Sequence, residues 1–289
     1  MKIGYPCINW SLPCRSSQTF RLKSFSEDRF LETVASNLAC LRQTLEWNVE
    51  HRLMFFRITS DVIPFGSHPV NQIEWWNVFQ KAFQEVGSYL QDHHFRISMH
   101  PGQYTLLNAP DEKVLANAVM DLEYHARVLD LLGLDTSHKV QIHVGGVYGD
   151  KEKSMERFVK VYKGLPSSIR TRLVIENDER SYSLQDCLKL HKELGIPVLL
   201  DTFHHSLLNE GETLREALQM AAKTWKKSDG VLMVDYSSQQ KNARFGMHAE
   251  HIDGEDFKSF LESAQGIHCD VMLEIKDKEK SALEALQSL

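Results

Sequence analysis

The stretch PVLLDTFHH, residues 197–205, decides the fold prediction, because an apolar strand-like run stops abruptly at a carboxylate and an imidazole. Charged groups are costly to bury unless they are paired or bound to a metal, so a packed core has no need of Asp201 and His204 here. A ring of parallel strands that delivers ligands to one face does need them. Five other runs end in the same way: RISMHPGQY (96–104, His100), KVQIHVGG (139–146, His143), RLVIENDER (172–180, Glu176), VLMVDYSSQ (231–239, Asp235) and DVMLEIKDK (270–278, Glu274).

Strand-like and helix-like segments alternate along all 289 residues. Helical candidates show apolar residues at i, i+3 and i+4 spacing, and the helix near Leu184–Leu194 has a stop signal in Gly195 and Pro197. The pattern predicts a single (β/α)8 TIM barrel over residues 1–289, with a metal site at the C-terminal face of the strands. The expected strands lie near Ile3–Tyr5, Leu53–Ile58, Phe95–Met99, Val140–His143, Leu173–Ile175, Val198–Leu200, Val231–Val234 and Val271–Glu274.

A doubly wound open sheet is the alternative fold. That fold usually carries a glycine-rich turn after its first strand, whereas PCINWSLPCRS, residues 6–16, contains no glycine. No apolar stretch is long enough to span a bilayer, and the first residues lack the apolar core of a signal peptide. The five cysteines include no C-x-x-C pair, and we expect reduced thiols in a cytoplasmic protein.

The net charge of −6 argues weakly against nucleic-acid binding, since such domains are usually basic. Bound cations would neutralise ligand carboxylates, however, and the charge is uneven along the chain. Residues 1–26 contain no acidic side chain but include Lys2, Arg15, Arg21 and Lys23. With Lys241 and Arg244, the last three of these are candidates for contacts with a phosphate backbone, although a solvated surface explains such charges equally well.

The residue types at the strand ends limit the kind of metal. Asp201 and His204 lie three residues apart and can clamp an ion, although an Asp that caps the next helix beside a surface histidine explains the pair equally well. Glu176 and Glu274 are candidate bridging ligands, and salt bridges at the barrel rim are the alternative. Histidines and carboxylates without thiolates suit Mn²⁺, Zn²⁺ or Fe²⁺, and the number of ligands suggests two or three ions.

At these positions the sequence resembles the UV-damage DNA endonucleases, a family that is similar to the endonuclease IV abasic-site enzymes. The resemblance implies a barrel with a cluster of metal ions, manganese first among them. It extends over nearly the whole chain, and its segments occur in the order GYPCIN (4–9), FRITSDVIPFGSHP (56–69), SMHPGQYTLLNAP (98–110), QIHVGGVYGDK (141–151), VIENDER (174–180), LLDTFHHSLLN (199–209), DYSSQ (235–239) and GMHAEHI (246–252).

The resemblance also implies roles for individual residues. Gln103 and Tyr104 match a pair that wedges into the duplex at the lesion, Tyr5 and Asn9 match the first loop that lines the site, and His68 matches a site-lining group. The catalytic groups in this interpretation are His100, His143, Glu176 and Glu274. The implied metal ligands are His100, His143, Glu176, Asp201, His204, Asp235, His248 and Glu274.

One position departs from the family pattern. Some relatives carry a modified lysine ligand on the seventh strand and a histidine ligand two residues later, where this chain has Met233 and Asp235. Methionine is a poor ligand for a hard cation, so the third ion and the identity of the metal are open, and a two-metal state is an alternative.

The function implied is a DNA repair endonuclease. We expect it to act as a monomer on damaged double-stranded DNA, with no membrane partner, and to cut immediately 5′ of a UV photolesion. Metal-assisted hydrolysis would leave a 3′-hydroxyl and a 5′-phosphate, and abasic sites are a second expected substrate. Two alternatives remain on the sequence alone: a metal-dependent sugar isomerase or epimerase on the same barrel, and a barrel that binds lesions without cutting.

Overall fold

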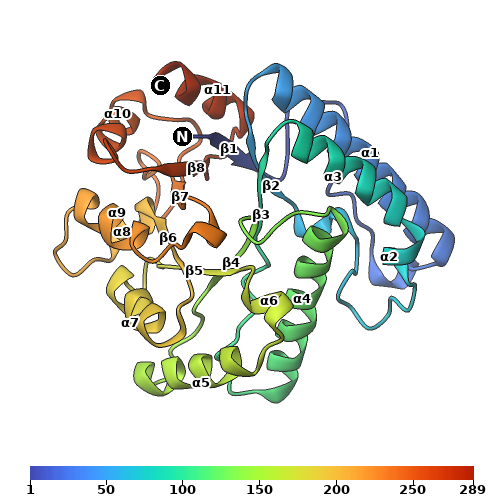
Figure 1. Ribbon diagram of the computed structural model, residues 1–289, viewed down its shortest axis with the longest axis horizontal. Coiled ribbons are helices and arrows are strands. Elements are labelled where there is room, and N and C mark those ends of the chain that lie inside the picture. The colour runs from blue at the N-terminus through green and yellow to red at the C-terminus, as the bar shows by residue number, and fades with distance from the viewer.

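Eight parallel strands form a closed barrel in which each strand pairs with its sequence neighbours and β8 pairs with β1. A computed structural model describes all residues from 1 to 289, and it confirms the predicted (β/α)8 architecture (Figure 1). The strands are β1 (Ile3–Pro6), β2 (Phe55–Ile58), β3 (Arg96–Met99), β4 (Lys139–His143), β5 (Leu173–Glu176), β6 (Val198–Asp201), β7 (Leu232–Tyr236) and β8 (Cys269–Leu273).

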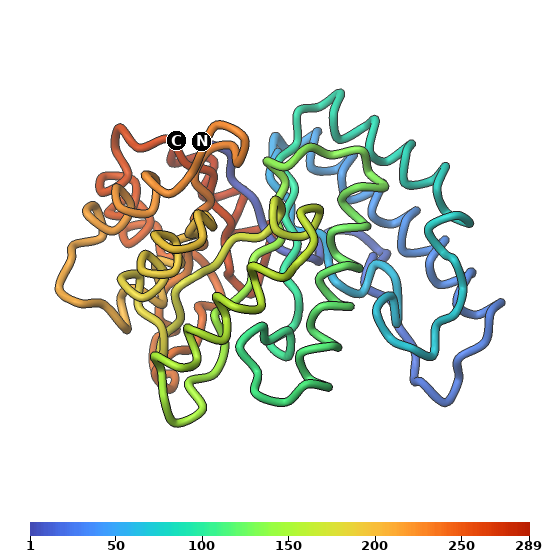
Figure 2. Tube along the Cα trace, turned by 60° about the horizontal axis from the view of Figure 1, so that its bottom comes forward, coloured from blue at the N-terminus to red at the C-terminus, as the bar shows by residue number.

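Helices surround the barrel in chain order, and the two chain termini lie close together in both views (Figures 1 and 2). The α-helices are α1 (Glu27–Glu50), α2 (Trp75–Val78), α3 (Gln80–Asp92), α4 (Glu112–Leu131), α5 (Lys151–Gly164), α6 (Ser167–Arg170), α7 (Leu184–Leu194), α8 (Thr202–Leu207), α9 (Leu214–Ala222), α10 (Gly254–Ser263) and α11 (Glu279–Gln287). Three 3₁₀ turns are η1 (Leu22–Ser24), η2 (Ser60–Val62) and η3 (Lys227–Asp229).

Local signals in the sequence fix the helix ends. The hydroxyl of Ser26 accepts a hydrogen bond from Arg29 N at the start of α1. Ser183 and Asp186 form a reciprocal capping box at the start of α7, which ends at Gly195 with φ of 69°, as its stop signal predicted. These caps satisfy backbone groups that the first and last helical turns leave without partners.

The inside of the barrel is built in layers, because side chains of a strand alternate between its two faces. An apolar layer of five buried side chains fills the middle of the barrel. Two residues further along each of the same five strands, a charged side chain points into the barrel just above this layer. The apolar members are Phe55, Val174, Leu199, Met233 and Met272, and the charged ones that follow them are Arg57, Glu176, Asp201, Asp235 and Glu274.

Two expectations from the sequence are wrong. Cys14 and Cys40 form a disulfide that ties the loop after β1 to α1, and only Cys7, Cys187 and Cys269 are free thiols. An odd number of cysteines excludes only the pairing of all of them: here one pair forms and three cysteines remain unpaired.

Tyr5 lies within β1, as the predicted strand Ile3–Tyr5 requires, but it is completely buried and does not belong to the first loop that the resemblance implied. Its hydroxyl donates to Asn48 Oδ1 at 2.6 Å and accepts from Asn9 Nδ2 at 2.8 Å. The side chain therefore points outward from the barrel wall toward α1, because it sits between the inward positions of the strand. None of the helices combines the length and the apolar character that crossing a membrane requires.

Candidate metal centre

The C-terminal ends of the strands open into a cavity of about 610 Å³. Its lining comes from loops far apart in the sequence, as expected for the mouth of a TIM barrel. The residues that line it are Pro6, Cys7, Arg57, His100, Pro101, Gln103, His143, Gly246, Met247, His248, Glu274, Ile275, Lys276 and Lys278.

His100 and His143, which line this cavity, form a close group with the buried Glu176. Glu176 Oε1 lies 3.0 Å from Nε2 of His100 and 3.0 Å from Nε2 of His143. The ligand atoms of all three residues lie within 4.8 Å of one another. Glu176 Oε1 is buried without a hydrogen-bond partner, although its other oxygen accepts from Gln141 at 2.7 Å.

Asp201 ends β6 and His204 lies in the following helix α8, and the pair fits both explanations that the sequence left open. Asp201 Oδ1 accepts from His204 N at 2.8 Å and thereby caps α8, yet His204 is largely buried beside it rather than on the surface. His204 Nδ1 donates to the carbonyl oxygen of Asn177 at 3.1 Å, which leaves Nε2 available to a ligand, with Glu179 Oε2 3.8 Å away from it. Asn177 also donates to the carbonyl oxygen of Asp201 at 2.9 Å and so holds this turn against β5.

His248 comes from the long loop after β7 and has the same arrangement. Its Nδ1 donates to the carbonyl oxygen of Glu274 at 2.9 Å, so its Nε2 is also free. The four imidazole rings form a chain across the mouth, with centroid separations of 5.4 Å from His100 to His143, 6.2 Å from His143 to His204 and 6.0 Å from His204 to His248.

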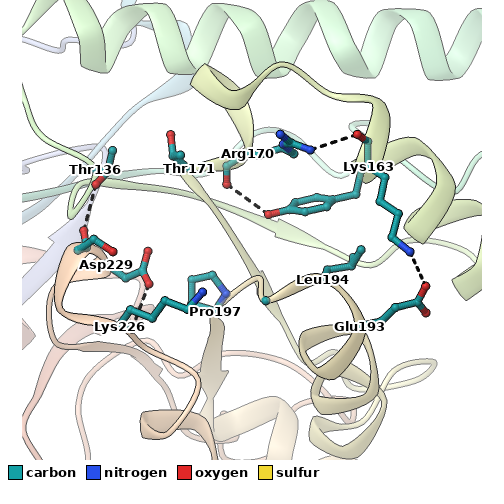
Figure 3. Close-up of a pocket in the computed structure, with 12 residues that line it drawn as sticks. Thr136, Lys163, Arg170, Thr171, Glu193, Leu194, Pro197, Lys226 and Asp229 are labelled. Atoms are coloured by element: carbon teal, nitrogen blue, oxygen red, sulfur yellow. Dashed lines mark hydrogen bonds and ion pairs between the residues drawn. The ribbon is translucent and has the colours of Figure 1, made fainter.

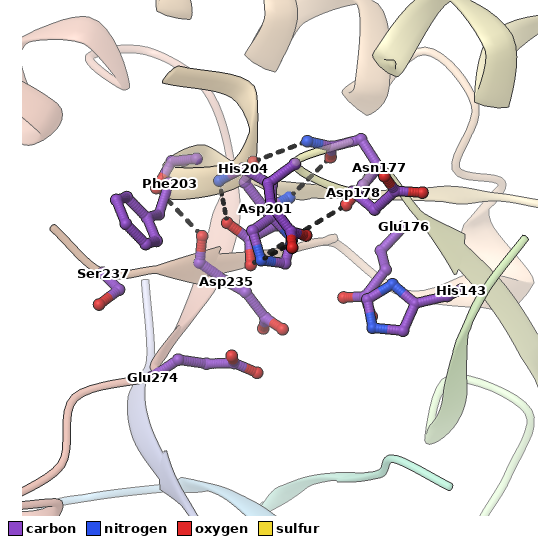
Figure 4. Close-up of polar contacts among 12 residues, drawn as sticks. His143, Glu176, Asn177, Asp178, Asp201, Phe203, His204, Asp235, Ser237 and Glu274 are labelled. Atoms are coloured by element: carbon purple, nitrogen blue, oxygen red, sulfur yellow. Dashed lines mark hydrogen bonds and ion pairs between the residues drawn. The ribbon is translucent and has the colours of Figure 1, made fainter. Parts of the chain in front are cut away.

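Two further carboxylates, that of Asp235 on β7 and that of Glu274 directly after β8, approach the same space. Figure 4 shows the carboxylates of Glu176, Asp235 and Glu274 directed toward the space between the strands. Glu176, Asp201 and Asp235 are all buried and form a second group whose oxygens lie within 4.8 Å of one another. The structure thus brings together the eight residues that the sequence singled out. Asp235 and Glu274 also form ion pairs with a positively charged side chain of the protein.

That cation is Arg57, which was not predicted from the sequence, and neither was its neighbour Gln141. The guanidinium of Arg57 donates from Nη2 to Asp235 Oδ2 at 2.7 Å and pairs through Nη1 with Glu274. Gln141 Nε2 donates to Glu176 and Asp235, each at 2.7 Å. A signal was present, because a polar residue in the middle of FFRIT or KVQIH must point either into the barrel or into an apolar helix interface.

The charges of the group alter the proton affinities of its members. Burial works to raise the pKa of Glu176, but His143 and His100 together hold it well below its ordinary value. Burial works to lower the pKa of His143, yet the Glu176 carboxylate outweighs it and raises that pKa to about 9. Burial raises the pKa of Asp201 to about 6. Burial likewise works to raise the pKa of Glu274, but Arg57 lowers it to about 2.

These residues fit divalent metal ions. Buried Glu176 Oε1 has two imidazole nitrogens at 3.0 Å but no hydrogen-bond partner. A divalent cation among these three groups would satisfy all of them at once. Nitrogen and oxygen donors without thiolates suit Mn²⁺, Zn²⁺ or Fe²⁺. Met233 lies in the apolar layer below Asp235 and offers no ligand to the group.

The other residues implied by the resemblance have varied surroundings. Gln103 lines the mouth, and Tyr104 beside it is 78% exposed. His68 is exposed on the loop after η2, where its Nδ1 accepts from Val70 N at 3.1 Å, and it does not line the cavity. Asn9 is buried against Tyr5.

Two of the five loop cations with a suggested role in DNA contacts are engaged within the chain. The guanidinium of Arg15 donates to backbone carbonyls of its own loop, including that of Asn9 at 3.3 Å. Lys241 pairs with Asp253 at 3.1 Å. Lys276 and Lys278, which were not predicted from the sequence, line the mouth itself. Arg57 is the positive charge in contact with the ligand group, and the lysines of the mouth come from the loop after β8 rather than from the loop after β1, although Lys276 also pairs with Glu250.

Figure 3 shows a second cavity, of about 360 Å³. Many of its lining residues lie in the segments just before β4, β5, β6 and β7, which places it at the opposite end of the barrel from the mouth. An ion pair between Lys163 and Glu193, 2.7 Å apart, lies at its edge, and Tyr162 forms part of its wall. No histidine lines it. The chemistry of the lining residues therefore favours the mouth at the C-terminal ends of the strands as the candidate functional site.

Comparisons with known proteins agree with this assignment. A family model described as UV-endonuclease UvdE matches residues 1–289. A UV DNA damage endonuclease of Clostridium perfringens is 41% identical over 291 residues, covering 100% of this chain and 71% of the relative. A UV DNA damage endonuclease of Bacillus thuringiensis subsp. konkukian is 33% identical over 299 residues, covering 100% of this chain and 94% of the relative.

Among solved structures, the crystal structure of SacUVDE superposes with a TM-score of 0.95 at 44% identity, covering 99% of this chain and 97% of that one. Endonuclease IV from Thermus thermophilus has a TM-score of 0.61 at 16% identity, covering 100% of both chains. A D-psicose 3-epimerase from Clostridium cellulolyticum has a TM-score of 0.59 at 14% identity, covering 99% of this chain and 97% of that one. The last two likenesses show a shared fold.

Proposed function

Because this chain belongs to the UV-endonuclease UvdE family, we propose that it is a DNA repair endonuclease that acts on UV-damaged double-stranded DNA. It hydrolyses the phosphodiester bond immediately 5′ of the photolesion and leaves a 3′-hydroxyl and a 5′-phosphate. Abasic sites are a second substrate. The observation that carries this proposal is the buried Glu176 oxygen that faces the imidazole nitrogens of two histidines that line the mouth.

Divalent ions in this centre, Mn²⁺ in our proposal, would activate a water molecule and stabilise negative charge on the scissile phosphate and the leaving oxygen. Glu176 lies between the two groups of ligands and bridges them. Hydrogen bonds to backbone carbonyls fix the rings of His204 and His248, so these ligands are oriented in advance. The residues that we propose as ligands and that do not contact Arg57 are His100, His143, Glu176, Asp201, His204 and His248.

The rim of the mouth recognises the lesion. A damaged step is easier to unstack than an intact one, so selection rests on deformability rather than on base edges. Tyr104, exposed beside Gln103, enters the gap and replaces lost stacking, which contributes about 1–3 kcal/mol per base. Lys278 and Lys276 line the mouth and attract the phosphate backbone, although Lys276 must exchange its partner Glu250 to do so.

Nicking of supercoiled plasmid tests the proposal. Irradiated and untreated plasmid are incubated with the protein in Mn²⁺, Zn²⁺ or Fe²⁺, and EDTA is added to a parallel sample. We expect nicks only in the irradiated plasmid and only with metal, with ends that a polymerase extends directly from the 3′-hydroxyl. Tight binding to irradiated DNA without cutting in any metal would favour a lesion-binding barrel. Absence of both binding and cutting would reopen the sugar isomerase or epimerase alternative.

A further inference from the structure

Arg57 occupies the position of a cation among the carboxylates of the centre. Its side chain rises from β2 into the barrel and is 3% exposed. The Nη2 atom lies 2.8 Å from Asp235 Oδ1 and 2.7 Å from Asp235 Oδ2, while Nη1 pairs with Glu274. The guanidinium therefore joins the carboxylate of Asp235 on β7 to that of Glu274, which directly follows β8.

Gln141 completes this arrangement and fixes its orientation. Its Oε1 accepts from Arg57 Nη2 at 2.7 Å, so its Nε2 must face the carboxylates. Nε2 donates to Glu176 Oε2 and to Asp235 Oδ2. Both oxygens of Asp235 are thus occupied by donors of the chain, whereas Glu176 keeps Oε1 for the side of the two histidines.

The charge balance of the centre distinguishes an occupancy of two divalent ions from one of three, the two numbers that the ligand types allow. Glu176, Asp201, Asp235 and Glu274 supply four negative charges inside the barrel. Two divalent ions together with Arg57 supply five positive charges, and a bound hydroxide balances them. Three divalent ions together with Arg57 would supply seven, and the surplus would have to be neutralised in a site that is partly removed from water.

We propose that Arg57 is a built-in cation of the centre, which holds Asp235 and Glu274 and takes the place of a third ion, so that the loaded protein contains two divalent ions. Arg57 is a positioning residue, because it acts through these two carboxylates and through Gln141 on Glu176. This inference rests on the proposed function only in taking the ligand group to be a metal centre. Asp235 and Glu274 then orient the site, and the remaining six candidate residues bind the ions.

Metal stoichiometry tests the inference without reference to activity. The full chain is equilibrated with excess Mn²⁺, freed of loosely bound metal and analysed by inductively coupled plasma mass spectrometry, with electron paramagnetic resonance as a second count. We expect two ions per wild-type chain. Three ions per chain, with Arg57 intact, would overturn the proposal even if the protein cuts irradiated DNA.

Substitutions of Arg57 test whether its guanidinium takes the place of a third divalent ion. Arg57→Met releases Asp235 and Glu274, and we expect the count to rise from two to three and the melting temperature to depend more strongly on Mn²⁺ than that of the wild type. Arg57→Lys keeps a charge, so its count stays at two, and it serves if Arg57→Met does not fold. A count that stays at two in Arg57→Met, or rises to three in Arg57→Lys, would contradict the proposal.

Arg96→Met is the matched control. Arg96 is also a buried arginine inside the barrel, and it pairs with Asp270 at 3.4 Å on β3 and β8, below the apolar layer and away from the ligands. The Arg96→Met protein loses a buried ion pair of the same kind, so we expect its stability to fall. We expect it still to bind two Mn²⁺ ions per chain. A rise to three in this control as well would show that any loosened barrel takes up extra metal, and the proposal would fall. If the wild-type protein binds two Mn²⁺ ions per chain but does not cut irradiated DNA, the proposal stands and the proposed function alone is contradicted.

Discussion

His143 and Glu176 lie opposite each other in the register of β4 and β5, and His143 Nε2 is 3.0 Å from Glu176 Oε1. Strand pairing therefore places a nitrogen ligand and an oxygen ligand side by side before any ion binds. A centre built on paired strands is more rigid than one built on loops, which is an advantage for metal ligands that must keep their geometry during hydrolysis.

Replacing Glu176 by glutamine removes the bridging charge while nearly preserving the shape of the side chain. We expect Glu176→Gln to lower the rate of cutting by about 100-fold or more and to reduce the bound metal, while the protein remains folded. Single-turnover cutting of a lesion duplex and metal analysis provide the measurements. Glu193→Gln, which removes a carboxylate from an ion pair at the other end of the barrel, is the control and keeps both activity and metal. Full activity of Glu176→Gln would remove Glu176 from the centre.

Tyr104 is the most exposed large aromatic side chain of the chain, and no packing in the barrel requires it to be there. We expect Tyr104→Ala to reduce the preference for damaged over intact duplex by about 10-fold, because the stacking that it supplies exists only where a base step has opened. Fluorescence anisotropy with both duplexes at one salt concentration measures this preference.

The control for Tyr104 is Tyr148→Ala, which removes another half-exposed ring from the loop after β4. It should leave the preference unchanged, since its ring already contacts the guanidinium of Arg157 at 5.4 Å. An equal loss of affinity of Tyr104→Ala for both duplexes would make Tyr104 a general contact rather than a lesion probe.

The strand ends were predictable because burial and ligand chemistry both act on them. In the segment LLDTF, residues 199–203, Asp201 is compatible with both a helix cap and a metal ligand. The structure shows that its carboxylate caps α8 and also faces the other ligands. The i, i+2 relation between Met233 and Asp235 also follows from strand geometry alone, and it places the methionine in the apolar layer.

The features that were missed depend on contacts between distant segments. Arg57 precedes its partner Asp235 by 178 residues, and no local pattern tells whether a strand arginine faces inward or outward. Tyr5 was assigned to the wrong side of β1 because the resemblance gives its position in the chain but not the direction of its side chain. The Cys14–Cys40 pair depends on how the first loop folds back on α1, which the cysteine count does not determine.

His138 makes stability depend on pH away from the metal centre. Its Nδ1 accepts from Ile97 N at 3.0 Å, an arrangement that requires the neutral ring. Burial, together with the nearby charges of Arg96, Arg172 and Lys2, outweighs the opposing effect of Asp135 and lowers the pKa of His138 from 6.5 to about 4. The unfolded chain thus binds a proton in this window while the folded chain does not, so stability is complete above about pH 6.5 and falls as the pH drops toward 4.

We expect the free energy of unfolding of the wild type to fall by about 1–2 kcal/mol more than that of His138→Asn between pH 7.5 and pH 5. Asparagine offers an oxygen near the position of Nδ1 and does not titrate. Urea unfolding at the two pH values measures the difference. Parallel losses in the two proteins would show that His138 titrates normally in the folded state.

The disulfide between Cys14 and Cys40 closes 26 residues of chain that include the loop after β1 and the first half of α1. Constraining a loop of this length in the unfolded state stabilises the folded protein by about 3 kcal/mol, so reduction should lower the melting temperature by several degrees. Alkylation followed by mass spectrometry should find three free thiols before reduction and five after it. Cys14→Ser should melt at the temperature of the reduced wild type and should no longer respond to the reductant. If the oxidised and reduced wild-type proteins melt together, the first loop is held by its other contacts, among them Gln18 with Asn37 of α1, and the disulfide adds nothing to the stability of the barrel.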